Sequence, residues 1–209
     1  LFEKVGIETT FVGHPLANKI PLQSNMNKYR KVLKLNREEL VIALLPGSRM
    51  GELKAHTDTL LETAQSLLRV YPDAKFLIPA NNDKNVNFIK GRIRNNPTKN
   101  LKLIKGKVDE ILSSSNIAIA ASGTASLQIA LHKKPMIIIY KGSWISYFIW
   151  KMVRLIPNVS LPNILLNENF VPEMLQHRAT PNLLSEKACK IINDKKYLKK
   201  IEFKFNRLH

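Results

Sequence analysis

The chain has 209 residues, a hydrophobic content of 44% and a formal net charge of +17, with a pI near 10.0. This size fits one large domain or one domain with appendages, and the apolar content is enough for a sizeable core. A single cysteine, Cys189, excludes an internal disulfide and a cysteine-based metal site, which favours a reducing, cytosolic compartment. The excess of cations favours anionic partners, namely nucleic acid, lipid headgroups or phosphorylated substrates. The alternative is a generally basic composition with no single target.

Residues 1–38 are expected to be the end of a preceding domain and a connector. A strand pattern from Val5 to Val12 ends at a Gly-His-Pro turn, and residues 24–36 are polar and basic with some helical character. His14 lies in that turn, and a lone histidine beside proline is more often structural than a ligand contact.

The main domain is expected over residues 39–193, where apolar strand patterns alternate with helical ones. Strands are predicted at residues 40–45, 74–79, 101–104, 117–121 and 136–140, and helices at 52–70, 83–94, 108–114 and from 124 to before Pro135. This order predicts an α/β fold with a doubly wound parallel sheet, of the Rossmann-like kind.

The central feature is the unit from Asn116 to Lys141, in which a buried-type strand, a small polar turn, a helix and a second strand follow one another. Its turn, Ser122-Gly123-Thr124, comes at the carboxyl end of a strand, where open α/β sheets bind ligands. Small residues there let a ligand approach the backbone, and the free N–H groups at the start of the helix suit a phosphate. The alternative is that Ser122 and Thr124 only cap the helix.

A second glycine turn, Pro46-Gly47-Ser48-Arg49, follows the strand at residues 40–45, and Glu52 lies three residues further on. Arg49 carries a permanent cation whose fork can grip a phosphate through two bonds. A diphosphate held between the two turns is therefore the predicted arrangement. A surface ion pair between Arg49 and Glu52 is the alternative.

Residues 142–156 read GSWISYFIWKMVRLI, in which aromatic side chains stand beside cations. This composition suits an interfacial helix or an acyl-chain groove, and a helix packed on a missing partner is the alternative. The apolar region around it, residues 135–153, is interrupted by Lys141, Gly142 and Lys151. It falls short of the roughly 20 apolar residues needed to span a bilayer.

The C-terminal part departs from the strand–helix alternation. Residues 159–162 are predicted to be extended, 163–170 a loop and 171–176 a short helix, before a last helix that ends near residue 193. The basic tail at 194–209 is expected to be either a frayed end or an amphipathic segment.

Several stretches together resemble the C-terminal half of lipid-A-disaccharide synthase, a glycosyltransferase of the GT-B type. They are VGHPL at 12–16, LLPGSR at 44–49 with Glu52, ASGTASL at 121–127, residues 135–140, VSLPN at 159–163, and PE and LQ at 172–173 and 175–176. Motifs in this order over about 165 residues are more specific than one glycine turn. The resemblance covers nearly the whole chain but only about half of the family's protein.

The resemblance implies a reaction. The family joins UDP-2,3-diacylglucosamine to 2,3-diacylglucosamine 1-phosphate, forms a β(1→6) disaccharide and releases UDP at the cytoplasmic face of the inner membrane. The implied partners are these lipids, the membrane surface, and either a separately made N-terminal half or a second copy of the chain. No metal or other cofactor is implied, because a helix terminus and an arginine supply the positive charge.

On this resemblance the chain binds the UDP part of the donor. Arg49 and the backbone of residues 122–124 would hold the diphosphate and stabilise the charge that builds on it as the sugar leaves. The substrate-binding residues expected are Gly47, Ser48, Arg49, Glu52, Ser122, Gly123, Thr124, Ala125, Gln128 and Asn163. Those expected at the membrane or acyl chains are Trp144, Tyr147, Phe148 and Trp150.

The chain departs from the family pattern in two respects. The family usually has Glu after the SGTA(T/S)L run, where it is expected to accept hydrogen bonds from the ribose hydroxyls. Here the residue is Gln128, which keeps one acceptor oxygen but loses the charge-assisted bond. The acceptor-side domain and its general base lie outside the chain, which is therefore expected to be a fragment or a split-gene product, inactive alone.

Two competing readings remain. One is another GT-B enzyme, such as a UDP-N-acetylglucosamine-dependent transferase or epimerase, against which the VSLPN and PE–LQ segments argue. The other is a non-catalytic basic module for anionic membrane or nucleic acid, whose nucleic-acid binding should weaken steeply with salt. The sequence has no RNA- or DNA-binding motif, so nucleic acid is not expected as a partner.

Overall fold

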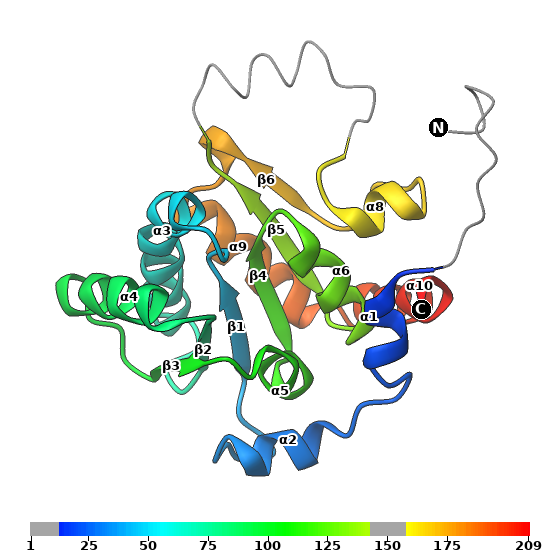
Figure 1. Cartoon of the computed structure of the whole chain (residues 1–209), viewed down its shortest axis with the longest axis horizontal. Coiled ribbons are helices and arrows are strands. Elements are labelled where there is room, and N and C mark those ends of the chain that lie inside the picture. Colours follow the sequence, from blue (N-terminus) through cyan, green and yellow to red (C-terminus); the bar gives the residue numbers. More distant parts are fainter. Residues whose placement is uncertain (1–12, 143–157) are drawn as a thin grey trace.

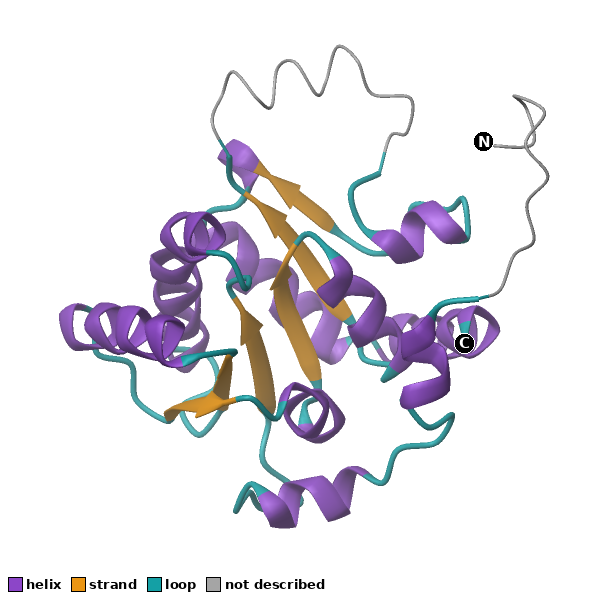
Figure 2. Cartoon of the chain, viewed as in Figure 1, coloured by secondary structure: helices purple, strands orange, loops and turns teal. Residues whose placement is uncertain are grey.

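The computed structural model describes residues 13–142 and 158–209, which fold around one six-stranded sheet (Figure 1). All neighbouring strands are parallel, in the order β3-β2-β1-β4-β5-β6. Helices cover both faces of the sheet (Figure 2). The doubly wound, Rossmann-like fold predicted from the sequence is thus confirmed.

The strands are short and, in the centre of the sheet, wholly buried. Their bounds are β1 Val41–Leu45, β2 Lys75–Ala80, β3 Leu101–Lys105, β4 Ile117–Ala121, β5 Met136–Tyr140 and β6 Glu173–Leu175. Every residue of β1 and β4 is buried, because both faces of a parallel sheet are covered and its central strands are apolar throughout. The five strands predicted within residues 39–193 are confirmed to within one residue at each end, and the strand pattern from Val5 to Val12 lies outside the described residues.

Most helices pack into two core clusters, one on each face of the sheet, and Ile20, Leu127 and Leu131 form a third, smaller cluster. Their bounds are α1 Pro15–Lys19, α2 Met26–Val32, α3 Met50–Leu68, α4 Asp83–Asn95, α5 Val108–Ser114, α6 Thr124–Leu131, α8 Leu161–Leu165, α9 Pro181–Asn193 and α10 Lys195–Leu208, with a 3-10 turn at Gln176–Arg178. Alternate residues of β1 serve the two clusters: Ile42 and Leu44 pack toward α3 and α9, whereas Val41 and Ala43 pack toward α5 and α6.

The segment after residue 157 differs from its prediction. The expected extended stretch begins helix α8, and the expected helix at 171–176 is instead strand β6, which pairs in parallel with β5 through Ile138 and Glu173. A strand of three residues is too short to show a period of two in the sequence. Gln176 follows the strand with a φ of +49°, a left-handed conformation that a regular α-helix over 171–176 would not contain, and it begins the 3-10 turn.

The C-terminal tail forms helix α10 with one buried face, so of the two alternatives the amphipathic segment is confirmed and the frayed end is wrong. Asp194 caps α10 by accepting a hydrogen bond from the N–H of Tyr197 at 2.8 Å. Ile201 and Phe205 are 1% and 0% exposed and belong to the core cluster on the α6 face. Lys195, Lys196, Lys199 and Lys200 lie on the solvent side of this packed helix, whereas Lys204 is mostly buried and pairs with Glu168.

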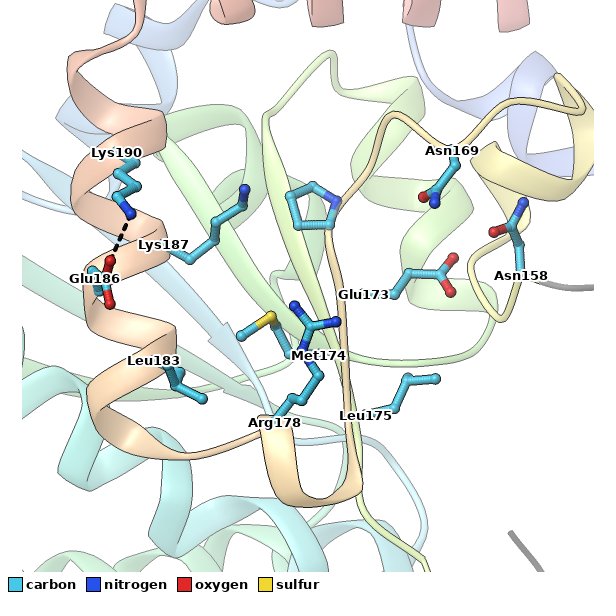
Figure 3. Close-up of a pocket in the computed structure, with 11 residues that line it drawn as sticks. Asn158, Asn169, Glu173, Met174, Leu175, Arg178, Leu183, Glu186, Lys187 and Lys190 are labelled. Atoms are coloured by element: carbon cyan, nitrogen blue, oxygen red, sulfur yellow. Dashed lines mark hydrogen bonds and ion pairs between the residues drawn. The ribbon is translucent and has the colours of Figure 1, made fainter. Parts of the chain in front are cut away.

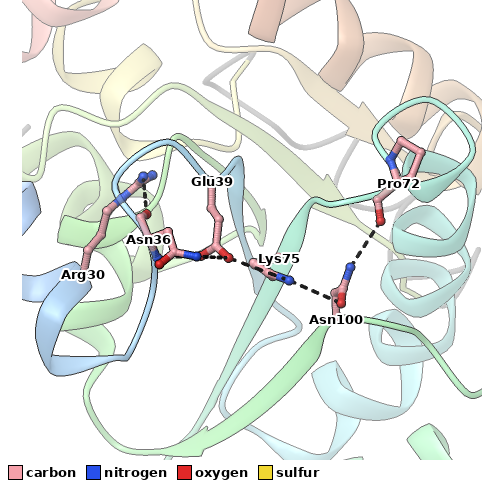
Figure 4. Close-up of polar contacts among 6 residues, drawn as sticks. All are labelled: Arg30, Asn36, Glu39, Pro72, Lys75 and Asn100. Atoms are coloured by element: carbon pink, nitrogen blue, oxygen red, sulfur yellow. Dashed lines mark hydrogen bonds and ion pairs between the residues drawn. The ribbon is translucent and has the colours of Figure 1, made fainter.

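Polar side chains tie together the edge of the sheet at which strands β1 to β3 begin (Figure 4). Arg30 of α2 donates to the carbonyl of Asn36 at 3.1 Å, and the N–H of Asn36 donates to Glu39 at 2.8 Å. Lys75 lies 3.8 Å from the Glu39 carboxylate and donates to Asn100 at 3.4 Å. These contacts hold the amino-terminal edge together, and a shallow hollow of about 510 Å³ lies there beside Asn36, Glu39 and Pro72.

Candidate functional site

The two glycine turns picked out in the sequence lie side by side in the fold. The turn after β1 and the turn after β4 follow neighbouring parallel strands, so both leave the sheet at its carboxyl edge. From β1 the chain runs outward through β2 and β3, and from β4 it runs the other way through β5 and β6. This reversal of strand order is the topological switch point at which open α/β sheets bind ligands.

A pocket of about 370 Å³ opens between the two turns. Nine of the ten predicted substrate-binding residues line it, namely Gly47, Ser48, Arg49, Glu52, Ser122, Gly123, Thr124, Ala125 and Gln128. The other lining residues are Leu45, Pro79, Asn81, Val108 and Ala121, of which only Leu45 and Ala121 belong to the motifs singled out in the sequence. Pro79 and Asn81 come from the end of β2, whose position beside β1 follows only from the strand order.

Glu52 occupies the amino terminus of α3. Its Oε2 accepts hydrogen bonds from the N–H groups of Ser48 at 2.7 Å and Arg49 at 3.1 Å. Because these donors already meet a carboxylate, they are not free for a phosphate. Arg49 itself extends into solvent, with its side chain 87% exposed and 3.7 Å from Glu52 Oε1. Such a long surface pair is weak, so the guanidinium can turn toward an anion at little cost.

The amino terminus of α6 is different, because no side chain caps it. Gly123 precedes the helix with a φ of +146°, and within residues 13–142 and 158–209 the N–H groups of Gly123, Thr124 and Ala125 have no acceptor. The alternative that Ser122 and Thr124 cap this helix is wrong, since the Ser122 hydroxyl donates to the carbonyl of Val159 at 2.9 Å. The open N–H groups and the positive end of the helix dipole form an anion-binding terminus facing the pocket.

His56 joins the two sides of this edge and was not anticipated from the sequence. Its Nδ1 lies 3.2 Å from the carbonyl oxygen of Pro46, and its Nε2 accepts the N–H of Lys141 at 3.0 Å. Only a neutral ring with its proton on Nδ1 satisfies both contacts. Burial is the main cause that lowers the pKa of His56, which keeps the ring neutral. The residue thereby links the turn after β1 to the end of β5.

A neighbouring hollow of about 650 Å³ extends the site along the same edge of the sheet. It shares Arg49, Glu52 and Ser122 with the pocket, and its other lining residues are Gly51, Ala55, His56, Tyr140, Lys141 and Gly142. A ligand longer than a nucleotide can therefore continue from one space into the other without leaving the carboxyl edge.

Asn163 lies apart from the pocket and is fully buried. Its amide donates to the carbonyl of Val171 and to Glu173, both at 2.9 Å, and accepts the N–H groups of Phe170 and Val171. Glu173 also accepts the N–H and hydroxyl of Ser160. The VSLPN and PE–LQ segments thus bind each other and fix the approach to β6. Trp144, Tyr147, Phe148 and Trp150 lie outside the described residues.

A second, basic pocket of about 480 Å³ lies between β6 and α9 (Figure 3). Arg178, Lys187 and Lys190 line it, and Lys190 is paired with Glu186 at 2.6 Å. It shares no lining residue with the pocket between the turns. Because basic side chains line this pocket and Arg49 lines the pocket between the two turns, substitutions here serve as matched controls for anion binding at the turns.

Two negative findings concern the described residues only. Among residues 13–142 and 158–209, no three His, Cys, Asp or Glu side chains gather closely enough to hold a metal ion. In the same ranges, none of the helices has the length and apolar character that crossing a membrane requires.

Solved structures share this fold at low sequence identity. UDP-GlcNAc 2-epimerase from Neisseria meningitidis, bound to UDP-GlcNAc, matches with a TM-score of 0.55 and 15% identity over 87% of this chain and 44% of that one. The E. coli ADP-heptose lps heptosyltransferase II matches with a TM-score of 0.59 and 11% identity over 82% of this chain and 52% of that one. The fold is therefore that of a Rossmann-like domain of the GT-B glycosyltransferases.

Sequence comparison gives the family. The family model described as Lipid-A-disaccharide synthetase matches residues 1–208. The lipid-A-disaccharide synthases of Dechloromonas aromatica and Methylobacillus flagellatus are 38% and 36% identical over 213 and 211 residues, and each alignment covers 100% of this chain. The chain belongs to the lipid-A-disaccharide synthetase family, as the resemblance indicated. It spans 56% of the length of each of these relatives.

Proposed function

We propose that this chain is the donor-nucleotide half of a lipid A glycosyltransferase that joins UDP-2,3-diacylglucosamine to 2,3-diacylglucosamine 1-phosphate. The observation that carries the proposal is the uncapped amino terminus of α6, which opens into a pocket that Arg49 also lines. Family membership supplies the chemistry of the donor, and the position of the pocket at the switch point agrees with it.

In this proposal the diphosphate lies against the N–H groups of Gly123, Thr124 and Ala125, and Arg49 turns from Glu52 onto the same phosphates. Negative charge grows on the diphosphate as the bond to the sugar breaks. Fixed N–H dipoles and a nearby guanidinium stabilise that charge without reorganisation. Gln128, on the same side of the pocket, meets the ribose.

The rest of the reaction requires groups supplied from elsewhere. The acceptor site and general base come from an N-terminal half, contributed by a separate chain or by the remainder of a longer one, and a homodimer is a further arrangement. We place the enzyme on the cytoplasmic face of the inner membrane, where a net charge of +17 favours anionic lipid. Trp144, Tyr147, Phe148 and Trp150 are proposed to contact membrane or acyl chains.

Calorimetric titration of the purified chain with UDP, and with uridine for comparison, tests the proposal. We expect UDP to bind and uridine to bind far more weakly, because the diphosphate contacts dominate. Arg49→Ala should weaken UDP binding by about 10-fold or more, the value of a charge-assisted bond pair. Arg178→Ala, which removes the same side chain from the other basic pocket, should leave it unchanged. Equal binding of UDP and uridine, or a loss with Arg178→Ala alone, would contradict the proposal.

A further inference from the structure

Gln128 is the first member of a hydrogen-bonded chain that leads away from the pocket. Its Nε2 donates to Oδ1 of Asp109 at 2.7 Å, and the same oxygen lies 2.9 Å from Nε2 of His132. Nδ1 of His132 lies 3.1 Å from the hydroxyl of Ser113. The His132 side chain is 2% exposed and that of Asp109 is 58% exposed, so the chain runs from the pocket rim into the core.

The charges in this chain determine where the protons lie. A carboxylate only accepts, so Asp109 requires the NH₂ of Gln128 and a proton on Nε2 of His132. Burial lowers the pKa of His132 despite the opposing effect of Asp109, which keeps the ring neutral, and its Nδ1 then accepts the Ser113 hydroxyl. Burial raises the pKa of Asp109, but the bonds from His132 and Gln128 outweigh it and lower the pKa overall. Ser113 is 1% exposed, so this is no hydrolytic triad.

We infer that Asp109, held by His132, is a positioning residue that makes Gln128 a hydrogen-bond acceptor toward the pocket. Gln128 lines the pocket and its NH₂ is bonded to Asp109, so Oε1 is the polar atom left for a ligand, and within the described residues no donor is bound to that oxygen. The matching ligand group is a pair of sugar hydroxyls, both donors, as on the ribose of a nucleoside diphosphate. Without Asp109, the Gln128 side chain could turn either its oxygen or its NH₂ group toward the ligand. The inference rests on the proposed function.

The test compares the dissociation constants of UDP and 2′,3′-dideoxy-UDP for the full chain. The unmodified chain should prefer UDP by about 10-fold, the value of one to two hydrogen bonds. Asp109→Ala should bring that ratio close to one by weakening UDP while leaving dideoxy-UDP unchanged. Asp58→Ala is the matched control, because it removes an aspartate paired with Arg92 outside the pocket. It should keep the preference.

A paired substitution separates positioning from simple loss of structure. Gln128→Glu places a second carboxylate against Asp109 and should weaken UDP binding several-fold. Asp109→Asn added to that variant replaces the facing carboxylate by an amide that can donate, and UDP binding should recover. A residue that only supports the fold would not show recovery on a second substitution.

Nitrogen NMR of the ligand-free chain provides a reading that does not depend on UDP. We expect the Nε2–H form of His132 and slow exchange of the Gln128 side-chain amide, both lost in Asp109→Ala. If the unmodified chain does not bind UDP, the proposed function and this inference fail together. If UDP binds but Asp109→Ala weakens UDP and dideoxy-UDP equally, or neither, the inference alone is overturned.

Discussion

A side chain on Gly47 would collide with Glu52, because an added Cβ would lie 2.4 Å from both the Cβ and Oε2 of Glu52. The φ of Gly47 is +111°, a conformation that other residues rarely adopt. The turn after β1 therefore depends on glycine for two independent reasons. It is the closeness of this turn to Glu52 that lets the carboxylate cap α3.

Gly47→Ala should accordingly lower the free energy of unfolding by about 1–3 kcal/mol and weaken UDP binding, since the strained backbone and the clash both displace the turn. Urea denaturation and calorimetry measure the two effects. Gly51→Ala is the matched control, because a Cβ there meets nothing within 4 Å. Within helix α3 it should stabilise by about 0.5–1 kcal/mol. Equal stability of the two variants would show that the turn is not constrained.

Glu173 holds the segment before α8 against β6. Its carboxylate accepts the N–H groups of Val159 and Ser160 at 3.0 Å, the Ser160 hydroxyl at 2.8 Å and the Asn163 amide at 2.9 Å. Glu173→Gln puts an NH₂ group against a backbone donor and should cost about 1–3 kcal/mol of unfolding free energy. Glu186→Gln breaks only an exposed pair with Lys190 and should leave the free energy of unfolding nearly unchanged. Similar losses of unfolding free energy in both variants would show that Glu173 does not hold this segment against β6.

The packing of α10 can be tested with two phenylalanines on one helix. Phe205 is fully buried, whereas Phe203 is 67% exposed. Phe205→Ala should lower the free energy of unfolding by about 3–5 kcal/mol, because it leaves a cavity beneath the helix. Phe203→Ala should change it by less than about 0.5 kcal/mol. If both substitutions were neutral, the tail would not be part of the folded domain.

The buried His56 makes stability depend on pH. Burial lowers the pKa of His56 in the folded chain. As the pH falls below the ordinary pKa of histidine, the unfolded chain therefore binds a proton that the folded chain does not bind. The free energy of unfolding should therefore fall from about pH 7.5 to about pH 5.5. In His56→Gln the free energy of unfolding should fall less over this pH range. Part of the remaining fall comes from His132, because burial lowers its pKa as well. An unchanged slope in His56→Gln would exclude His56 as a source.

The sheet could be predicted from the sequence because its central strands are continuous apolar runs that end in glycine turns. Strand β6 could not, since its three residues carry no period and its pairing with β5 is a long-range contact. The same limit applies to the site. Arg49 and the turn at Gly123 can be recognised in the sequence by their residue types. The hydrogen bond between Asp109 and Gln128 cannot, because it forms only when helices α5 and α6 pack side by side. Asn163 was predicted to bind substrate because it belongs to the VSLPN motif. Its amide instead forms hydrogen bonds to other residues of the chain, such as the carbonyl of Val171.

The central claim is that the nucleotide diphosphate binds at the amino terminus of α6, and amide chemical shifts of the ¹⁵N-labelled chain during a UDP titration test it most directly. We predict that the N–H signals of Gly123, Thr124 and Ala125 move most and saturate together, with smaller changes at Gly47. Uridine should move them little. Largest changes at Arg178 and Lys187, in the basic pocket between β6 and α9, or no saturable change at α6, would contradict the account.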